Sequence, residues 1–567
     1  MHRKLSAILI WISCLAFILG LLAVADYLIF GGSYTGMTYS LWAWQAHWKW
    51  AFWAPVIIFG CGLGTAIHFW RKSSILKRQG KHSESASAWA AGWISIIIVV
   101  VVALISLVVL LYLQDGSRQM ALLKQAKVQR IGEPVAIQDQ RRLPFVVAKT
   151  AANLRYNRPN YHLTDAHLVR SCSGEWMWSM IQTPKRNWLR STGGIVQISA
   201  QSAAAGAREV KVVTQSFKYG PGMHVRDSLT YQIRKQLGRD VDVPETVGFI
   251  DCAGQPRLLS PVMKWNNAGS TRFKSQIGVA VTRPDGNIKY YSLAAARANP
   301  GLVKTGRLIA SQQATAVAES YRYINGRQNQ SGGLLGFINK GDQRGRYEVL
   351  QTSDKNTQPY LLQGADGQAY WVTMLRPYRS GKALGGIMYT NSVSGISKLW
   401  LAPVDKSGVG TSSVIGPDAA MGFTDIQTPY INTARLQSTE PRLFLSSEGK
   451  LSYIVNLATS DSRRVVAAVA VDSLTGDPLA LFNYQRDSNA EQKLKEYLAN
   501  GKIPDGTSLQ GDAGTGITPS QPEDGTESKS NTKVPFSLTS SPLTPSQLAA
   551  LLAACQKDRT CRQQLLK

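Results

Sequence analysis

Three long apolar stretches near the amino terminus constrain this chain more than any other feature of its 567 residues. They run from about Leu5 to Phe30, from Trp50 to Trp70 and from Ala88 to Leu113. Each is long enough to cross the roughly 30 Å of hydrocarbon in a bilayer. The first is too long for the apolar region of a cleaved signal peptide. The pattern therefore predicts three transmembrane helices that form a membrane anchor over residues 1–114.

Aromatic residues and loop charges favour the same arrangement. Five tryptophans lie around the join between the first two stretches, where amphipathic rings prefer the headgroup layer: Trp42, Trp44, Trp48, Trp50 and Trp53. A carbohydrate-binding platform is the alternative for this cluster. Basic residues at 3–4 and 71–81 outnumber the single Lys49 between the first two stretches, which predicts a cytoplasmic amino terminus. We expect a multi-pass protein of the plasma membrane with a large extracytoplasmic carboxy-terminal domain.

Four segments beyond residue 150 share one plan: a strand, a Gly turn, an aromatic-rich strand, and a second hairpin with its own Gly turn. They cover residues 168–213, 247–293, 360–402 and 442–484. In the last two segments the second turns end at Gly395 and Gly476, which are 81 residues apart. Alternating apolar and polar positions around Gly turns predict hairpins with one buried face. The shared plan indicates a duplication.

Helical spacing of apolar residues at 228–238 and 311–326 places helices between these units. The expected fold class is a membrane-anchored α+β protein, with three amino-terminal transmembrane helices followed by tandem repeats of an antiparallel sheet plus a helix. The predicted domains are the anchor (1–114), a juxtamembrane connector (115–150), paired repeats one and two (151–300), paired repeats three and four (301–500), a flexible low-complexity linker (503–543) and a carboxy-terminal helical element (544–567).

One hairpin carries a resemblance to a known family. The segment VAVDSLTGDPLALF at 469–482 is similar to the terminal hairpin of PepSY repeats. The sheet-plus-helix unit resembles the PepSY and cystatin-like class of small domains. The resemblance covers that hairpin type alone. It implies an inhibitory, binding or scaffold role rather than catalysis.

Four cysteines lie outside the predicted spans. Cys172 and Cys252 each precede the glycine of a first turn by two residues, so they occupy equivalent positions in repeats one and two. Packing about a local two-fold axis would bring them together, which predicts a disulfide; two buried free thiols are the alternative. Cys555 and Cys561 are six residues apart. A disulfide between them requires a turn around residues 557–559, because one continuous helix would hold them too far apart.

Charge and motifs limit the chemistry. The net charge is +27, of which about +21 falls after residue 114, and it favours anionic lipids, acidic wall polymers or acidic proteins. The sequence contains no GxSxG, P-loop, HExxH or paired CxxC motif. His162 and His167 have Asp165 between them and fall on different faces of a helix or strand, which argues against a metal site. No catalytic residue, cofactor or metal is predicted.

We therefore expect a non-enzymatic integral membrane protein whose repeat domain acts as a binding or scaffold module in the cell envelope. The expected partners are membrane lipids, proteins bound through hairpin edges and the carboxy-terminal helix, and anionic wall polymers. Nucleic acid has only net charge in its favour, and homo-oligomerisation is left open. Two alternatives remain: a structural subunit of an envelope-spanning secretion or conjugation machine, and an envelope enzyme with a dispersed site.

Overall fold

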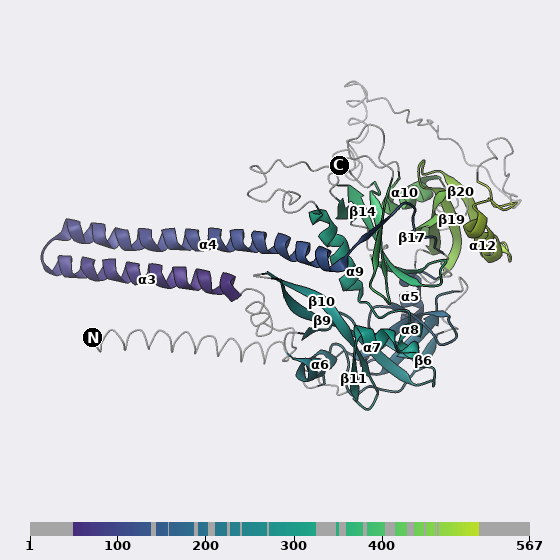
Figure 1. Ribbon diagram of the computed structural model, residues 1–567, viewed down its shortest axis with the longest axis horizontal. Helices are drawn as coiled ribbons and strands as arrows, with labels where there is room; N and C mark the ends of the chain where they lie inside the picture. The colour runs from purple at the N-terminus through teal and green to yellow at the C-terminus, as the bar shows by residue number, and fades with distance from the viewer. Residues whose placement is uncertain are drawn as a thin grey trace, which may run out of the picture. The chain divides into compact units, whose positions relative to one another are not determined.

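The computed structural model describes most of the chain between residues 49 and 509 (Figure 1). The described ranges are 49–137, 143–156, 158–185, 191–201, 210–223, 227–238, 241–268, 271–324, 347–350, 359–377, 383–402, 414–427, 436–446, 449–459, 461 and 464–509. The chain divides into two compact units, Met1–Gly511 and Asp512–Lys567, and every described residue lies in the first.

Two long helices form an antiparallel hairpin: α3 (Lys49–Arg78) and α4 (His82–Ala126) (Figure 1). Near the turn, Ser73 Oγ donates to the carbonyl of Ser85 at 2.8 Å, and Ser85 Oγ donates back to the carbonyl of Ser73 at 3.0 Å. Gly92 permits a close approach of the helices, since an added Cβ would lie 2.5 Å from Trp70 Nε1. The hairpin is thus held by polar bonds and tight packing.

The prediction of three membrane spans is wrong. The second and third predicted spans lie in α3 and α4, yet no helix, over the residues that the structure describes, is both long and apolar enough to cross a bilayer. Apolar runs gave the prediction, whereas the described turns of the hairpin also contain a buried serine pair and five basic residues between 71 and 81. The predictions of a plasma-membrane location and of an orientation, which were deduced from the spans, are therefore wrong as well.

The remaining parts of that prediction fall on residues or side chains outside the described set. The first predicted span and three of the tryptophans, Trp42, Trp44 and Trp48, lie outside the described residues. Trp50 and Trp53 lie in α3, but their side chains are outside the described set.

Over the described residues, four small sheets follow the hairpin, and their strand pairs are antiparallel apart from one pair in sheet III. Sheet I contains β2 (Tyr161–Leu163), β3 (His167–Arg170), β4 (Trp176–Pro184), β5 (Gly194–Ser199) and β6 (Lys211–Val213). Sheet II contains β7 (Val241–Asp242), β8 (Val247–Ile250), β9 (Pro256–Ala268), β10 (Thr271–Thr282) and β11 (Ile288–Ser292). Sheet III contains β12 (Tyr347–Val349), β13 (Tyr360–Gln363), β14 (Ala369–Pro377), β15 (Gly386–Asn391) and β16 (Ser397–Leu401), with β1 (Gln129–Ile131) added in parallel beside β16. Sheet IV contains β17 (Leu436–Leu445), β18 (Leu451–Thr459), β19 (Val465–Asp472) and β20 (Pro478–Asn483).

Each of the four repeated segments supplies most of one sheet and begins with the same hairpin. We call β3, β8, β13 and β17 the first strands; each pairs with the strand that follows it. Every turn between them has a glycine with φ between +75° and +88°, at Gly174, Gly254, Gly367 and Gly449. Glycine suits these positions because it lacks the Cβ that makes a left-handed backbone costly. The hairpin is therefore encoded locally in each sheet.

Helices connect and cover the sheets. They are α5 (Phe145–Arg155), α6 (Leu229–Leu237), α7 (Leu293–Arg297), α8 (Pro300–Lys304), α9 (Ser311–Ser320) with the 3₁₀ turn η2 (Tyr321–Tyr323), α10 (Pro417–Gln427) and α12 (Ala490–Asn500). Residues 503–509, at the start of the predicted linker, lie beside β20, where Leu481 N donates to the carbonyl of Thr507.

Most of the hydrophobic cores lie between sheets, and one lies between sheet III and α9 with η2. One core combines Val169 and Met177 of sheet I with Phe249 and Leu259 of sheet II. A second combines side chains of sheets I, III and IV, and a third combines sheets III and IV. Each sheet thus buries apolar side chains against at least one neighbouring sheet, and the small sheets are arranged as in a β-propeller. The predicted fold class, tandem sheet-plus-helix repeats on a three-helix membrane anchor, is wrong.

Candidate functional site

First strands of three sheets meet at a cavity of about 230 Å³, which we call the first-strand cleft. Its wall includes His167 at the start of β3, Tyr360 at the start of β13, Arg442 on β17 and Phe145 at the start of α5. Sheet II contributes indirectly, through Glu245 just before β8. The cleft therefore collects residues from three sheets at one place, and Glu245 connects the fourth sheet to it through Arg307.

A buried arginine ties these sheets together at the cleft. The side chain of Arg307 is 3% exposed, and its Nη2 donates to Glu245 Oε2 at 3.0 Å and to His167 Nδ1 at 3.2 Å. Its Nη1 donates to the carbonyl of Leu168 at 3.2 Å. The guanidinium lies 4.6 Å from the ring centroid of Trp371. One side chain thus joins sheets I, II and III.

The carboxylate of Glu245 stays ionised although it is buried. Burial favours the neutral acid and raises its pKa, but the charge of Arg307 and the hydrogen bonds from Ser311 outweigh burial and lower the pKa of Glu245. Ser311 supplies two donors, its N–H at 3.1 Å and its Oγ at 2.7 Å. The pair Arg307–Glu245 is therefore a fully charged, desolvated ion pair.

His167 is neutral at physiological pH. Burial, and secondly the positive charge of Arg307, lower the pKa of His167 from 6.5 to about 4. Because Arg307 Nη2 donates to Nδ1, the hydrogen-bond partner assigns the ring proton to Nε2. The ring lines the cleft and retains an N–H donor.

The lowered pKa of His167 predicts that the free energy of unfolding decreases below neutral pH. The unfolded chain binds a proton near pH 6.5, whereas the folded chain resists it until about pH 4. Stability from this group is therefore complete above pH 6.5 and is lost as the pH falls to 4, by up to about 3 kcal/mol. Urea unfolding between pH 4 and 7.5 measures the slope. His167→Asn, which keeps an acceptor for Arg307, should flatten it; an unchanged slope would contradict the assignment.

A strained residue lies on the wall from sheet IV. Glu440 has φ of +46°, a left-handed conformation that non-glycine residues rarely adopt. It lies in a bulge of β17 between Thr439 and Arg442, which re-aims the strand at this point. Glu440 Oε1 accepts a hydrogen bond from the Phe145 N–H at 2.6 Å. Strained backbone of this kind concentrates at functional sites.

Arg442 and Asp165 complete the polar wall. Arg442 is 1% exposed, so its guanidinium is a second buried cation in the cleft. Asp165 accepts a hydrogen bond from Lys149 Nζ at 2.7 Å. That bond lowers the pKa of Asp165 and outweighs the opposing effect of burial. The cleft therefore offers both cationic donors and anionic acceptors.

Aromatic rings supply the apolar wall. The indole N–H of Trp178 donates to the carbonyl of Leu143 at 2.9 Å, and that of Trp371 to the carbonyl of Ile309 at 2.8 Å. Phe145 packs edge-on against Trp178, with ring centroids 5.9 Å apart. Because both indole N–H groups are bonded within the protein, these rings present apolar surface to the cleft.

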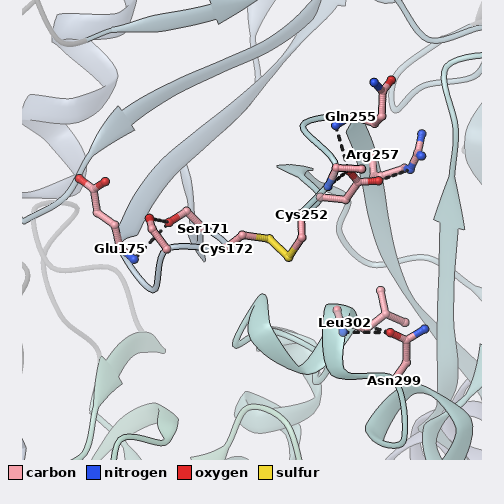
Figure 2. Close-up of a disulfide and its surroundings, with 12 residues drawn as sticks. Ser171, Cys172, Glu175, Cys252, Gln255, Arg257, Asn299 and Leu302 are labelled. Carbon is pink, nitrogen blue, oxygen red and sulfur yellow. Dashed lines mark hydrogen bonds and ion pairs between the residues drawn. A yellow bond between two sulfur atoms is a disulfide. The ribbon is translucent and has the colours of Figure 1, made fainter.

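The structure joins Cys172 and Cys252 in a disulfide, with a Cα–Cα distance of 5.3 Å (Figure 2). The bridge links the first turns of sheets I and II. Cys555 and Cys561 lie outside the described residues. His162 bonds Thr183 Oγ1 at 2.9 Å and is not part of the cleft wall, whereas His167 lines the cleft. Within the described ranges, no group of three His, Cys, Asp or Glu side chains could hold a metal ion.

Sequence reasoning missed Glu245, Arg307, Glu440 and Arg442. The first two are single charged residues in loops, with no motif around them. One signal was present for the others: Pro441 lies inside the segment that folds as β17, and proline inside a strand is typical of an edge or a bulge.

Comparison with known proteins identifies no family for this chain. No protein-family model and no curated protein sequence matches the chain. Among solved structures, the crystal structure of an endo-arabinase from Bacteroides thetaiotaomicron is similar over 55% of this chain and 76% of its own length, with 8% sequence identity and a TM-score of 0.17. A likeness at that TM-score supports no inference about fold or function.

Proposed function

We propose that this chain is a non-enzymatic binding protein whose first-strand cleft holds a small polyhydroxylated ligand, such as a sugar unit. The observation that carries the proposal is the convergence of buried charges, donors and aromatic rings from separate sheets on one cavity. Their sequence positions are far apart, so only the assembled fold brings them together.

Energetic cost supports a functional role for these charges. Burying an ion pair such as Arg307–Glu245 costs several kcal/mol of desolvation per ion, and apolar residues of similar volume are often neutral or stabilising in its place. Within the described part of the chain, Arg307 Nε is also buried without a hydrogen-bond partner.

The mixture of groups favours hydroxyls as the ligand chemistry. Arg307 and His167 are donors, whereas Glu440 and Asp165 are acceptors. A hydroxyl both donates and accepts, so a polyol can satisfy both kinds of group. The apolar face of a sugar ring would pack on the aromatic wall that contains Phe145. The opposite charges in the wall favour a neutral ligand over a polyanion.

Binding without turnover is proposed because the polar groups are held by protein partners. Asp165 is bonded to Lys149, His167 to Arg307, and Glu440 to the N–H of Phe145. Such bonds fix orientation, whereas a general acid or base must be free to exchange its proton with the substrate.

A glycan array of defined neutral oligosaccharides tests the proposal, followed by calorimetric titration of the tightest glycan. The double variant Asp165→Asn and Glu440→Gln removes two anionic acceptors while preserving shape. We expect its affinity to fall about tenfold or more, since hydrogen bonds to charged groups contribute about 1.5–3 kcal/mol.

The matched control is Asp477→Asn with Glu133→Gln, which makes the same change of charge at exposed positions outside the cleft. Its affinity should equal that of the wild type. Equal weakening in both double variants would contradict the cleft as the site. No binding to any glycan would overturn the ligand class, and release of cleaved product would overturn the non-enzymatic role.

A further inference from the structure

A second cavity, of about 340 Å³, lies on sheet II beside the disulfide. Figure 2 shows Cys252 at this position, with Arg257 beyond its turn and Asn299 and Leu302 of the α8 region nearby. It shares no lining residue with the first-strand cleft over the described part of the chain. The two cavities are therefore formed by different residues.

Strand register brings three basic residues to this cavity. Leu258 of β9 pairs with Thr282 of β10, so Arg257 and Arg283 lie at adjacent strand ends. Val281 of β10 pairs with Lys289 of β11. All three cations line the cavity. Like charges on neighbouring strands destabilise a sheet, so their gathering calls for a compensating negative charge.

The protein supplies part of that compensation. Asp251 Oδ2 lies 3.0 Å from Arg257 Nε and neutralises it. Arg283 and Lys289 are exposed, and neither forms an ion pair with any residue that the structure describes. The ammonium of Lys289 lies 4.9 Å from the ring centroid of Tyr291, which holds it over the sheet face. The cavity is left with two uncompensated positive charges.

A neutral donor lies opposite these cations. Asn299 Oδ1 caps α8 by accepting from the N–H groups of Gly301 at 3.0 Å and Leu302 at 3.3 Å. The side-chain oxygen is thereby used, and the amide Nδ2 remains as a donor in the cavity wall. Cations on the sheet and an amide donor on the helix side are the groups that bind oxyanions.

We propose that this cavity binds a small multivalent oxyanion, a ligand with at least two negative charges on phosphate or carboxylate groups. The basic net charge of the chain would raise the local concentration of such ligands. Arg283 and Lys289 supply the charge, and the turn that contains Cys252 forms the adjoining wall.

Calorimetric titration with inorganic pyrophosphate and with citrate tests the proposal on the full-length chain. Wild-type protein should bind at least one of them, and the stronger ligand distinguishes phosphate from carboxylate. Arg283→Gln with Lys289→Gln should weaken binding about tenfold or more, because each removes a charged donor. Both side chains are exposed, so the fold should be preserved, as circular dichroism can verify.

Two further variants sharpen the test. Lys304→Gln with Lys450→Gln removes the same charge from exposed positions that do not line the cavity, and it should bind like the wild type. Asp251→Asn keeps the Oδ1 acceptor for the turn N–H groups but removes the competing carboxylate. It should bind about threefold more tightly. No wild-type binding at millimolar ligand, or equal weakening in both double variants, would overturn the proposal.

Discussion

Replacing Cys172 and Cys252 together with Ser is expected to lower the free energy of unfolding by about 4 kcal/mol. The bridge joins residues 80 positions apart, and cross-linking a loop of that length removes roughly that much conformational entropy from the unfolded chain. It also fixes the first turn of sheet I to that of sheet II, whose strands share a hydrophobic core. Urea unfolding followed by tryptophan fluorescence measures the loss.

Reductant provides the matched control for the disulfide. Reduced wild-type protein should unfold at the same urea concentration as the double Ser variant, and reductant should leave the variant unchanged. A difference below about 1 kcal/mol between oxidised and reduced wild type would contradict a stabilising bridge. A reductant effect that persists in the variant would place the sensitive thiols elsewhere.

Glu245→Gln is expected to destabilise the protein by about 3–5 kcal/mol, because it leaves the cation of Arg307 buried without its counter-charge. Glutamine preserves the shape and an acceptor for Ser311, so the loss reports charge rather than volume. Thermal unfolding of the purified variant measures the effect.

A double-mutant cycle separates the ion pair from its surroundings. Arg307→Met combined with Glu245→Leu should cost less than the sum of the single changes, since neither buried charge then lacks its partner. Asp487→Asn removes a surface carboxylate paired to Lys493 at 2.9 Å and should leave the unfolding midpoint nearly unchanged. Additive effects of the two buried changes would show that the charges do not interact as the structure indicates.

Local patterns in the sequence were sufficient to place the repeated hairpins. The four turn glycines are read from spacing because a left-handed turn position is set by a single residue. The equivalent positions of Cys172 and Cys252 follow from the same spacing, and the structure joins them. The similarity of 469–482 to PepSY hairpins stays a prediction; in the structure this segment forms β19, its turn and β20.

The packing of sheets could not be read in the same way. Whether an apolar face meets its own helix or another sheet depends on contacts between segments far apart in the chain, as for Met177 and Leu259. Apolar runs alone gave the wrong reading for the helical hairpin.

The cleft could not be predicted from the sequence for a related reason. Arg307, Glu245 and His167 are ordinary residues in sequence, and their chemistry arises from burial and mutual contact. Only the proline beside Glu440 indicated locally that the strand is irregular at the site.

Hydrogen exchange with the tightest glycan from the array tests the central claim most directly. We expect slower amide exchange in peptides that cover residues 165–170 and 436–445, which contribute first strands to the cleft. Exchange in residues 283–291, beside the second cavity, should be unchanged. Protection confined to 283–291, or no change in 165–170 and 436–445 at saturating glycan, would contradict a binding protein with its ligand in the first-strand cleft.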